Sequence, residues 1–247
     1  VSITPDAAPV GTELICTAIA EDADGDTVDL TYLWSDGTEG DSYLITADND
    51  PGDTIECTAR ATDITGAYVE DSATATVENT EPEVTATVTP SEAQVGQVLT
   101  CDATASDSDG GEPTLAYAWS TGAEGPTYVV TDTDNPGTTL TCTVTATDDD
   151  GGTDTTTASA LVTNTLPVLV AVTITPATGA AGDTLTCEAA ATDADGGEPT
   201  IAYTWSDGTE GDSLTIAPGT ETGTVLVCTA TASDTDGGTD TGTAEAT

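Results

Sequence analysis

The stretch from Cys101 to Ser120 reads CDATASDSDGGEPTLAYAWS, and the run TLTCTVTATDDDGG, which carries Cys142, follows it. Trp119 stands 18 residues after the first cysteine, and the second cysteine stands 41 residues after the first. Threonine, valine and alanine alternate around all three positions, a pattern that predicts short strands. About seven such strands with a Cys…Trp…Cys arrangement are typical of an immunoglobulin-like sandwich.

The same triple occurs three times, because Cys16, Trp34 and Cys57 precede this stretch and Cys187, Trp205 and Cys228 follow it. A fixed period indicates a repeat architecture. We expect domains at residues 1–80, 81–165 and 166–247, with the third ending inside its last strand as part of a longer array. The predicted fold class is all-β, with three tandem immunoglobulin-like Greek-key β-sandwiches in a linear rod on the order of 110 Å long.

The second repeat illustrates the expected strands. They are bounded by turn signals at Gly110-Gly111, Asn135-Pro-Gly137 and Gly151-Gly152. The expected ranges are 84–89, 98–105, 115–120, 127–131, 139–146 and 153–162.

The charge balance excludes whole classes of function. Arg60 is the only basic residue against 45 acidic ones, which gives a formal net charge of −44, and there is no Lys or His. Such a polyanion cannot hold nucleic acid, and anionic lipid headgroups should repel it. Without His or Lys there is no Ser–His–Asp catalysis and no P-loop. No apolar run approaches 18 residues, so we expect no direct membrane insertion of this fragment.

The six cysteines are expected to pair within repeats, as Cys16–Cys57, Cys101–Cys142 and Cys187–Cys228. Free buried cysteines are the alternative. Regular pairing favours disulfides in an extracellular or cell-surface protein. Closing each loop would contribute about 3–4 kcal/mol on the chain-entropy model.

The runs Ala105-Ser-Asp-Ser-Asp-Gly110, Tyr117-Ala-Trp-Ser120 and Thr145-Ala-Thr-Asp-Asp-Asp-Gly-Gly-Thr153 resemble bacterial PKD-type repeats and related immunoglobulin-like or cadherin-like surface repeats. The resemblance covers all three repeats. It implies an extracellular, repetitive protein with an adhesive or stalk-forming role.

Two acidic loops recur in each repeat, each starting six residues after a cysteine. We call these the first and second acidic loops, and their glycines permit a sharp turn. Their aspartates are Asp22, Asp24 and Asp26, then Asp107 and Asp109, then Asp193 and Asp195 in the first loops; Asp63, then Asp148 and Asp150, then Asp234 and Asp236 in the second loops.

In a Greek-key sandwich both loops emerge at the end where the preceding linker arrives, and we call this end the acidic pole. The linkers add Asn79 and Glu81 before the second repeat and Asn164 before the third. Converging carboxylates repel one another, and Ca²⁺ prefers oxygen ligands, so we predict Ca²⁺ at these positions. The alternative is a set of solvated Asp-Gly turns in a chain adapted to high salt.

Other residues are expected to have structural roles. Trp34, Trp119 and Trp205 should be core, and the tyrosines two residues before them should lie on the same strand face. Arg60 should pair with a neighbouring acid on the sheet surface.

Three functions compete. The first is a structural segment of an extracellular filament, stalk or giant adhesin, whose partners are like repeats or copies of itself in a filament or surface layer. The second is a binding module for carbohydrate or protein, which would need one repeat to carry an exposed aromatic patch that the sequence does not reveal. The third is an enzyme, which we do not expect because the acids lie in turns rather than in a cleft.

Overall fold

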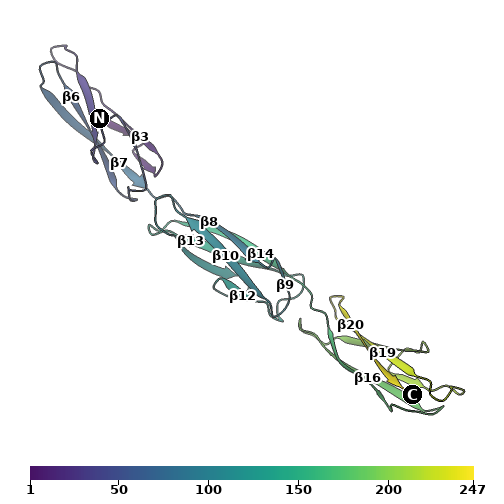
Figure 1. Ribbon diagram of the computed structural model, residues 1–247. Helices are drawn as coiled ribbons and strands as arrows, with labels where there is room; N and C mark the ends of the chain where they lie inside the picture. The colour runs from purple at the N-terminus through teal and green to yellow at the C-terminus, as the bar shows by residue number, and fades with distance from the viewer. The chain divides into compact units, whose positions relative to one another are not determined.

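The computed structural model describes all 247 residues and contains twenty β-strands joined by turns and loops (Figure 1). No helix in it has the length and apolar character needed to cross a membrane. Backbone contacts divide the chain into two compact units. The first contains Val1–Ala86, Ala103–Tyr117 and Thr143–Thr157; the second contains Thr87–Asp102, Ala118–Cys142 and Ala158–Thr247. The division into three domains at residues 80 and 165 stays a prediction.

The first repeat lies wholly in the first unit and forms two sheets. A three-stranded sheet has the order β1-β3-β5, and a four-stranded sheet has the order β2-β7-β6-β4. The strands are β1 (Ser2–Thr4), β2 (Ala7–Pro9), β3 (Glu13–Thr17), β4 (Asp29–Trp34), β5 (Ser42–Leu44), β6 (Thr54–Thr62) and β7 (Tyr68–Glu78). All pairs are antiparallel except β2 with β7, which is parallel.

The third repeat lies wholly in the second unit and has the sheet orders β15-β16-β18 and β17-β19-β20. Its strands are β15 (Val168–Thr175), β16 (Thr184–Thr192), β17 (Thr200–Trp205), β18 (Ser213–Thr215), β19 (Leu226–Ser233) and β20 (Thr239–Ala246). Every pair is antiparallel.

The second repeat has the sheet orders β12-β10-β8 and β11-β13-β14-β9. Its strands are β8 (Glu83–Thr89), β9 (Glu92–Ala93), β10 (Val98–Ser106), β11 (Thr114–Trp119), β12 (Thr127–Val129), β13 (Thr139–Thr147) and β14 (Thr153–Val162). All six expected strands are present, with bounds that shift by at most two residues. Sequence reasoning missed β9, and its counterpart β2, because two or three residues are too few to show a period.

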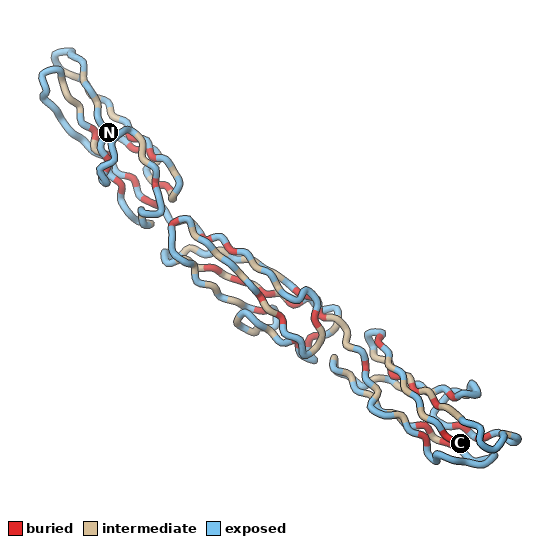
Figure 2. Tube along the Cα trace, in the orientation of Figure 1, coloured by how far each residue is buried: buried red, intermediate tan, exposed pale blue.

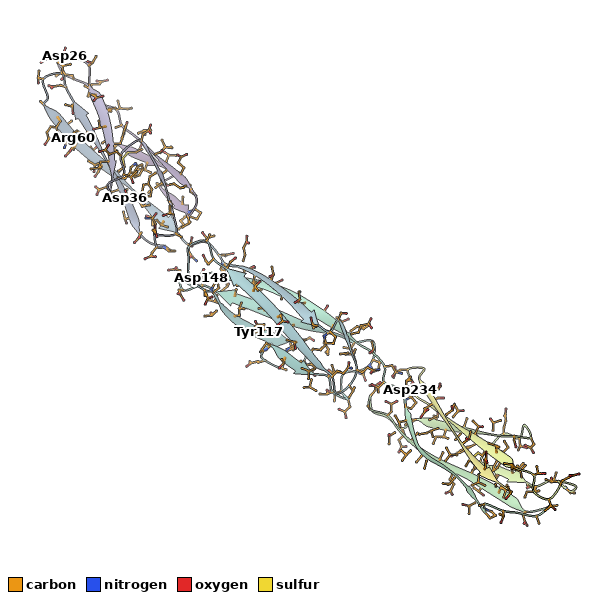
Figure 3. All side chains as sticks on the ribbon, in the orientation of Figure 1. Asp26, Asp36, Arg60, Tyr117, Asp148 and Asp234 are labelled. Carbon is orange, nitrogen blue, oxygen red and sulfur yellow. A yellow bond between two sulfur atoms is a disulfide. The ribbon has the colours of Figure 1, made fainter.

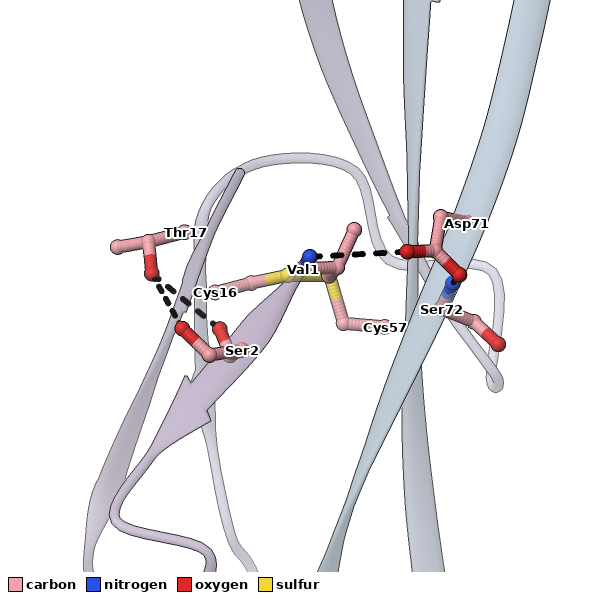
Figure 4. A network of polar contacts seen from close by, with 7 residues as sticks. All are labelled: Val1, Ser2, Cys16, Thr17, Cys57, Asp71 and Ser72. Carbon is pink, nitrogen blue, oxygen red and sulfur yellow. Dashed lines mark hydrogen bonds and ion pairs between the residues drawn. A yellow bond between two sulfur atoms is a disulfide. The ribbon is translucent and has the colours of Figure 1, made fainter. Parts of the chain in front are cut away.

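The disulfides join the two sheets of each repeat, which confirms the sandwich. Each predicted pair is bonded, and the Cα atoms lie 6.4–6.5 Å apart. No free cysteine remains. Figure 4 shows the bond between Cys16 on β3 and Cys57 on β6, beside the hydrogen-bonded hydroxyls of Ser2 and Thr17 at 2.9 Å.

Alternation along the strands sets the core. In β13, Leu140, Cys142, Val144 and Ala146 are buried while the threonines between them face outward, so one period-two pattern fills the interior (Figure 2). This alternation supplies the apolar burial that stabilises a chain with so few aromatic residues.

The tryptophans are core residues, as expected. Trp34, Trp119 and Trp205 are 1–3% exposed, and each indole N–H donates to a glycine carbonyl six residues on, at 2.9–3.0 Å. Trp34 lies opposite Cys57 in register, and Trp205 lies opposite Cys228. Tyr32 and Tyr203 pack half-buried against these cores.

Candidate functional site

The first aspartate of every acidic loop folds its own turn. In the first loops, Asp22, Asp107 and Asp193 accept the backbone N–H two residues on through Oδ1, at 2.7–2.9 Å. In the second loops, Asp63, Asp148 and Asp234 accept two backbone N–H groups each, two and four residues on, at 2.7–3.0 Å. One oxygen of each carboxylate is therefore used in side-chain-to-backbone turn chemistry.

The remaining carboxylate oxygens hold the linker that enters the second repeat. The Asn79 side-chain amide donates to Asp148 Oδ2 at 3.1 Å. Thr80 donates its backbone N–H and its hydroxyl to Asp109, which is only 8% exposed. Figure 3 labels Asp148, on the loop between β13 and β14.

A third carboxylate secures the start of the following strand. The backbone N–H of Val84 donates to Asp154 Oδ2 at 3.2 Å. Pro82, between these anchored residues, is fully buried. We call the three carboxylates Asp109, Asp148 and Asp154 the linker clamp of the second repeat.

The third repeat builds the same clamp on its own linker. Asn164 donates to Asp234 Oδ2 at 3.0 Å, the Thr165 N–H donates to Asp195, and the Leu169 N–H donates to Asp240 Oδ2 at 2.9 Å. Pro167 is fully buried, as Pro82 is. The arrangement is thus a property of the repeat, set by an Asn-Thr pair in each linker.

Two glycines make room for the clamp. A Cβ atom added to Gly152 would clash with Asp148 Oδ2 and lie 2.6 Å from the Asn79 amide nitrogen, and one added to Gly238 would clash with Asp234 Oδ2 and lie 2.8 Å from that of Asn164. Real Cβ atoms do not approach other atoms so closely, so any side chain here would displace the aspartate and the asparagine that bonds to it.

The first repeat has the same loops, but other residues stand at two of the positions that the clamp uses. Both Asp63 oxygens accept from the Thr65 hydroxyl, at 2.8 and 3.0 Å. Ala67 stands where the other repeats have Gly152 and Gly238, and Val69 stands where they have Asp154 and Asp240. Asp24 and Asp26 are exposed.

The charges at the second loops follow from these contacts. The hydrogen bond from Asn164 is the largest cause that lowers the pKa of Asp234, and the loop N–H groups add to it. Desolvation raises the pKa of Asp148, but donors from Asn79 and the loop outweigh it and lower the pKa overall. Desolvation and the negative charges of Asp148 and Asp109 raise the pKa of Asp150.

The carboxylates do not converge on one point. No group of three or more acidic side chains lies close enough to hold a metal ion. The structure brings Asn79 to Asp148, and Asn164 to Asp234, but Glu81 is exposed and makes no such contact. Asp150 and Asp236 each donate a backbone N–H to their own loop.

Several oxygen atoms at these poles nonetheless lack a partner. Asp107 Oδ2 is buried without a hydrogen bond in the second repeat. In the third repeat Asn164 Oδ1, Thr165 Oγ1 and Asp195 Oδ1 are all buried and unpartnered. A buried acceptor without a donor costs free energy, so these atoms are the observation that bears on a bound cation.

Sequence reasoning missed Asp154, Asp240 and the two threonines of the linkers. The available signal was the Asn-Thr pair that both linkers share three residues before a proline. The Greek-key topology had already placed Asn79 and Asn164 near the second loops, but nothing in the sequence showed that their amides would donate to Asp148 and Asp234.

No family model matches this chain, and no curated protein matches it. Among solved structures, it is similar to Sidekick-1 immunoglobulin domains 1–5 at 18% identity and a TM-score of 0.37, over 99% of this chain and 57% of that one. It is also similar to Drosophila N-cadherin EC1–4, at 14% identity and a TM-score of 0.39, over 98% and 72% of the two chains. A third similar structure is Protocadherin Gamma B2 extracellular cadherin domains 3–6, at 14% identity and a TM-score of 0.38, over 100% of this chain and 75% of that one. Likeness at this level assigns neither a partner nor an activity.

Proposed function

We propose that this chain is a structural segment of an extracellular filament, stalk or large adhesin. The observation that carries the proposal is the linker clamp, which repeats with the same residue types at both linkers. A linker whose asparagine and threonine both donate to aspartate side chains cannot act as a flexible tether. Such a linker suits a spacer that keeps its length under load.

The proposed partners are like repeats, or copies of the chain itself, in a filament or surface layer. One disulfide per repeat favours an oxidising compartment, and hence an extracellular or cell-surface location. The proposal gives the chain no enzymatic role, because the carboxylates are engaged in loop and linker hydrogen bonds. The PKD-type origin and the linear rod stay predictions.

Replacing the Asn-Thr pairs tests the structural role. We expect the change of Asn79, Thr80, Asn164 and Thr165 to glycine to make both linkers flexible while each sandwich stays folded. Backbone ¹⁵N relaxation of the linker amides would then show fast motion in the variant and sandwich-like rigidity in the parent. Fast motion in the parent itself would contradict the proposal.

The finer proposal is that Ca²⁺ stiffens these poles. The donor set would be oxygen only: Asp107 Oδ2 in the second repeat, and Asn164 Oδ1, Thr165 Oγ1 and Asp195 Oδ1 in the third. Ca²⁺ takes six to eight oxygen ligands, including backbone carbonyls and water, so a donor set with one carboxylate at each pole does not exclude it. The unpartnered buried oxygens support the fit of a hard cation here.

Calorimetry tests the ion. We expect Ca²⁺ to bind in low-salt buffer and to raise the thermal midpoint, because an ion bound only by the folded state stabilises it. At a free concentration 100 times Kd the gain would be about 2.7 kcal/mol. Asp107→Ala with Asp195→Ala should remove the effect, while Asp36→Ala, in a turn between β4 and β5, should not. No heat of binding and no change on chelation would contradict a Ca²⁺ site.

A further inference from the structure

The outer face of β4, β6 and β7 in the first repeat differs from the same face in the third. In the third repeat the register aligns mainly hydroxyl residues across β17, β19 and β20: Thr204, Thr229 and Thr243 in one row, and Ala202, Thr231 and Thr241 in the next. In the first repeat the corresponding rows are Leu33, Thr58 and Ser72, and Thr31, Arg60 and Glu70. The only basic residue of the chain thus lies at the centre of this face.

These larger side chains border a groove of about 550 Å³. Its lining includes Leu33, Glu39, Thr58, Arg60 and Glu70. That volume falls within the range of about 300–1,000 Å³ that small-molecule sites occupy. Leu33 is 49% exposed, so the groove offers an apolar surface next to charged groups.

The guanidinium of Arg60 is held in place from two sides. Its Nε donates to Glu70 Oε1 at 2.7 Å, and its central carbon lies 4.2 Å from the centre of the Tyr68 ring. Tyr68 is itself 56% exposed. The pairing of Arg60 with a neighbouring acid is confirmed (Figure 3 labels Arg60).

The charges select the class of ligand. Glu70 already neutralises Arg60, and Glu39 leaves the groove with a net negative charge in a chain of −44, so an anion is repelled. A small cation is not favoured here either, because the guanidinium repels it and carboxylates are plentiful elsewhere on the surface. A neutral polyol is favoured, because its hydroxyls can accept from the guanidinium and donate to the two carboxylates.

We propose that this groove binds a neutral oligosaccharide, with Arg60, Glu70 and Glu39 on the sugar hydroxyls and Leu33 against a sugar face. The role goes beyond that of a spacer: the first repeat would carry a recognition site that the other repeats lack. Neither the linker clamps nor the Ca²⁺ proposal involves these residues, so either can fail without the other.

The test is a titration of the full chain with cello-, chito-, malto- and mannohexaose, followed by NMR shifts of the first-repeat amides. We expect at least one to bind, with one ligand per chain, and Arg60→Thr to weaken binding at least tenfold. Threonine stands at this position in the other two repeats, so the variant should fold. No binding by any of the four, or equal binding by the variant, would overturn the proposal, as would preferential binding of polygalacturonate.

A graft gives the matched gain of function. The second repeat already has Leu115, Tyr117, Glu124 and Gly125 at the positions of Leu30, Tyr32, Glu39 and Gly40. Ala116→Thr, Ala118→Leu, Thr145→Arg, Thr153→Tyr and Thr155→Glu would complete the set. We expect two ligands per chain, and a stoichiometry that stays at one in a folded graft would show that these residues do not make the site.

Discussion

The acidic pole of the first repeat and those of the other two repeats share their loop motifs but use them differently. In the second and third repeats, Asp148 and Asp234 each give one oxygen to the loop and one to a linker asparagine. In the first repeat, Asp63 gives both oxygens to Thr65 and its own loop. The motif alone therefore specifies a turn, and the neighbouring residues decide which donors reach the remaining aspartate oxygen.

Two of these neighbours are decisive. Gly152 and Gly238 leave room for the asparagine amide, whereas Ala67 fills that room in the first repeat. Asp154 and Asp240 each accept a backbone N–H just after a linker, at the start of β8 and β15. Val69 has no acceptor for this role. Both differences act in one direction, because each replaces a residue that the clamp uses in the other two repeats.

Of the changes that test this comparison, removing one disulfide should have the largest effect on stability. We expect Cys101→Ala with Cys142→Ala to cost about 3–4 kcal/mol and to unfold the second repeat, together with its clamp, at a lower temperature. The first repeat keeps its own bond and should melt as in the parent. Thermal unfolding followed by the environments of Trp119 and Trp34 measures this, and a single shared shift of all repeats would contradict it.

Gly152→Ala and Gly238→Ala place the alanine of the first repeat into the other two. The sign of the change in thermal midpoint then tests the clamp. Neither Gly152 nor Gly238 has a positive φ, so alanine there would stabilise a free loop by about 0.4–1 kcal/mol. With a clamp in place, the new Cβ displaces Asn79 or Asn164, and the thermal midpoint should fall by about 4 °C.

The control is Ala67→Gly in the first repeat, where both oxygens of Asp63 accept from Thr65, and it should lose a little stability through backbone entropy. A rise in the midpoint on Gly152→Ala and Gly238→Ala would show that the linkers are not held as described.

A smaller effect concerns the carboxyl titrations. Asn164→Ala should raise the pKa of Asp234, because that hydrogen bond is the largest cause of its lowering from the ordinary 3.8. Since the folded pKa is lowered, the bond stabilises the fold above pH 3.8 and is lost as the pH falls through the lowered value.

The matched control is Asp63, whose pKa is lowered chiefly by Thr65 and should not respond to any linker change. Carboxyl ¹³C titrations read both groups in one sample. A parallel shift of Asp63 and Asp234 in the Asn164→Ala chain would contradict the assignment.

The strands, the disulfides and the tryptophan core were predictable because each depends on a local pattern or a fixed period. The meeting of the linker asparagines with the acidic loops was predictable from the topology, but the individual hydrogen bonds of the clamp were not, because Thr80 and Asp109 are brought together only by the pairing of the strands that flank them. The groove was not predictable either: Arg60 and Glu70 lie ten residues apart on β6 and β7, and only their register makes them neighbours. The predicted convergence of four carboxylates at each pole overlooked the linker amides, which take up carboxylate oxygens first.

Residue-level hydrogen exchange of the linker amides tests the clamp most directly. We expect the N–H groups of Thr80 and Thr165 to be protected, because Asp109 and Asp195 accept them. Asp109→Ala and Asp195→Ala should each abolish protection at its own linker and leave the other unchanged. If Thr80 and Thr165 exchange at the rate of an open chain in the parent, while the strand amides of β13 and β19 stay protected, the linkers are free and the aspartates do not clamp them.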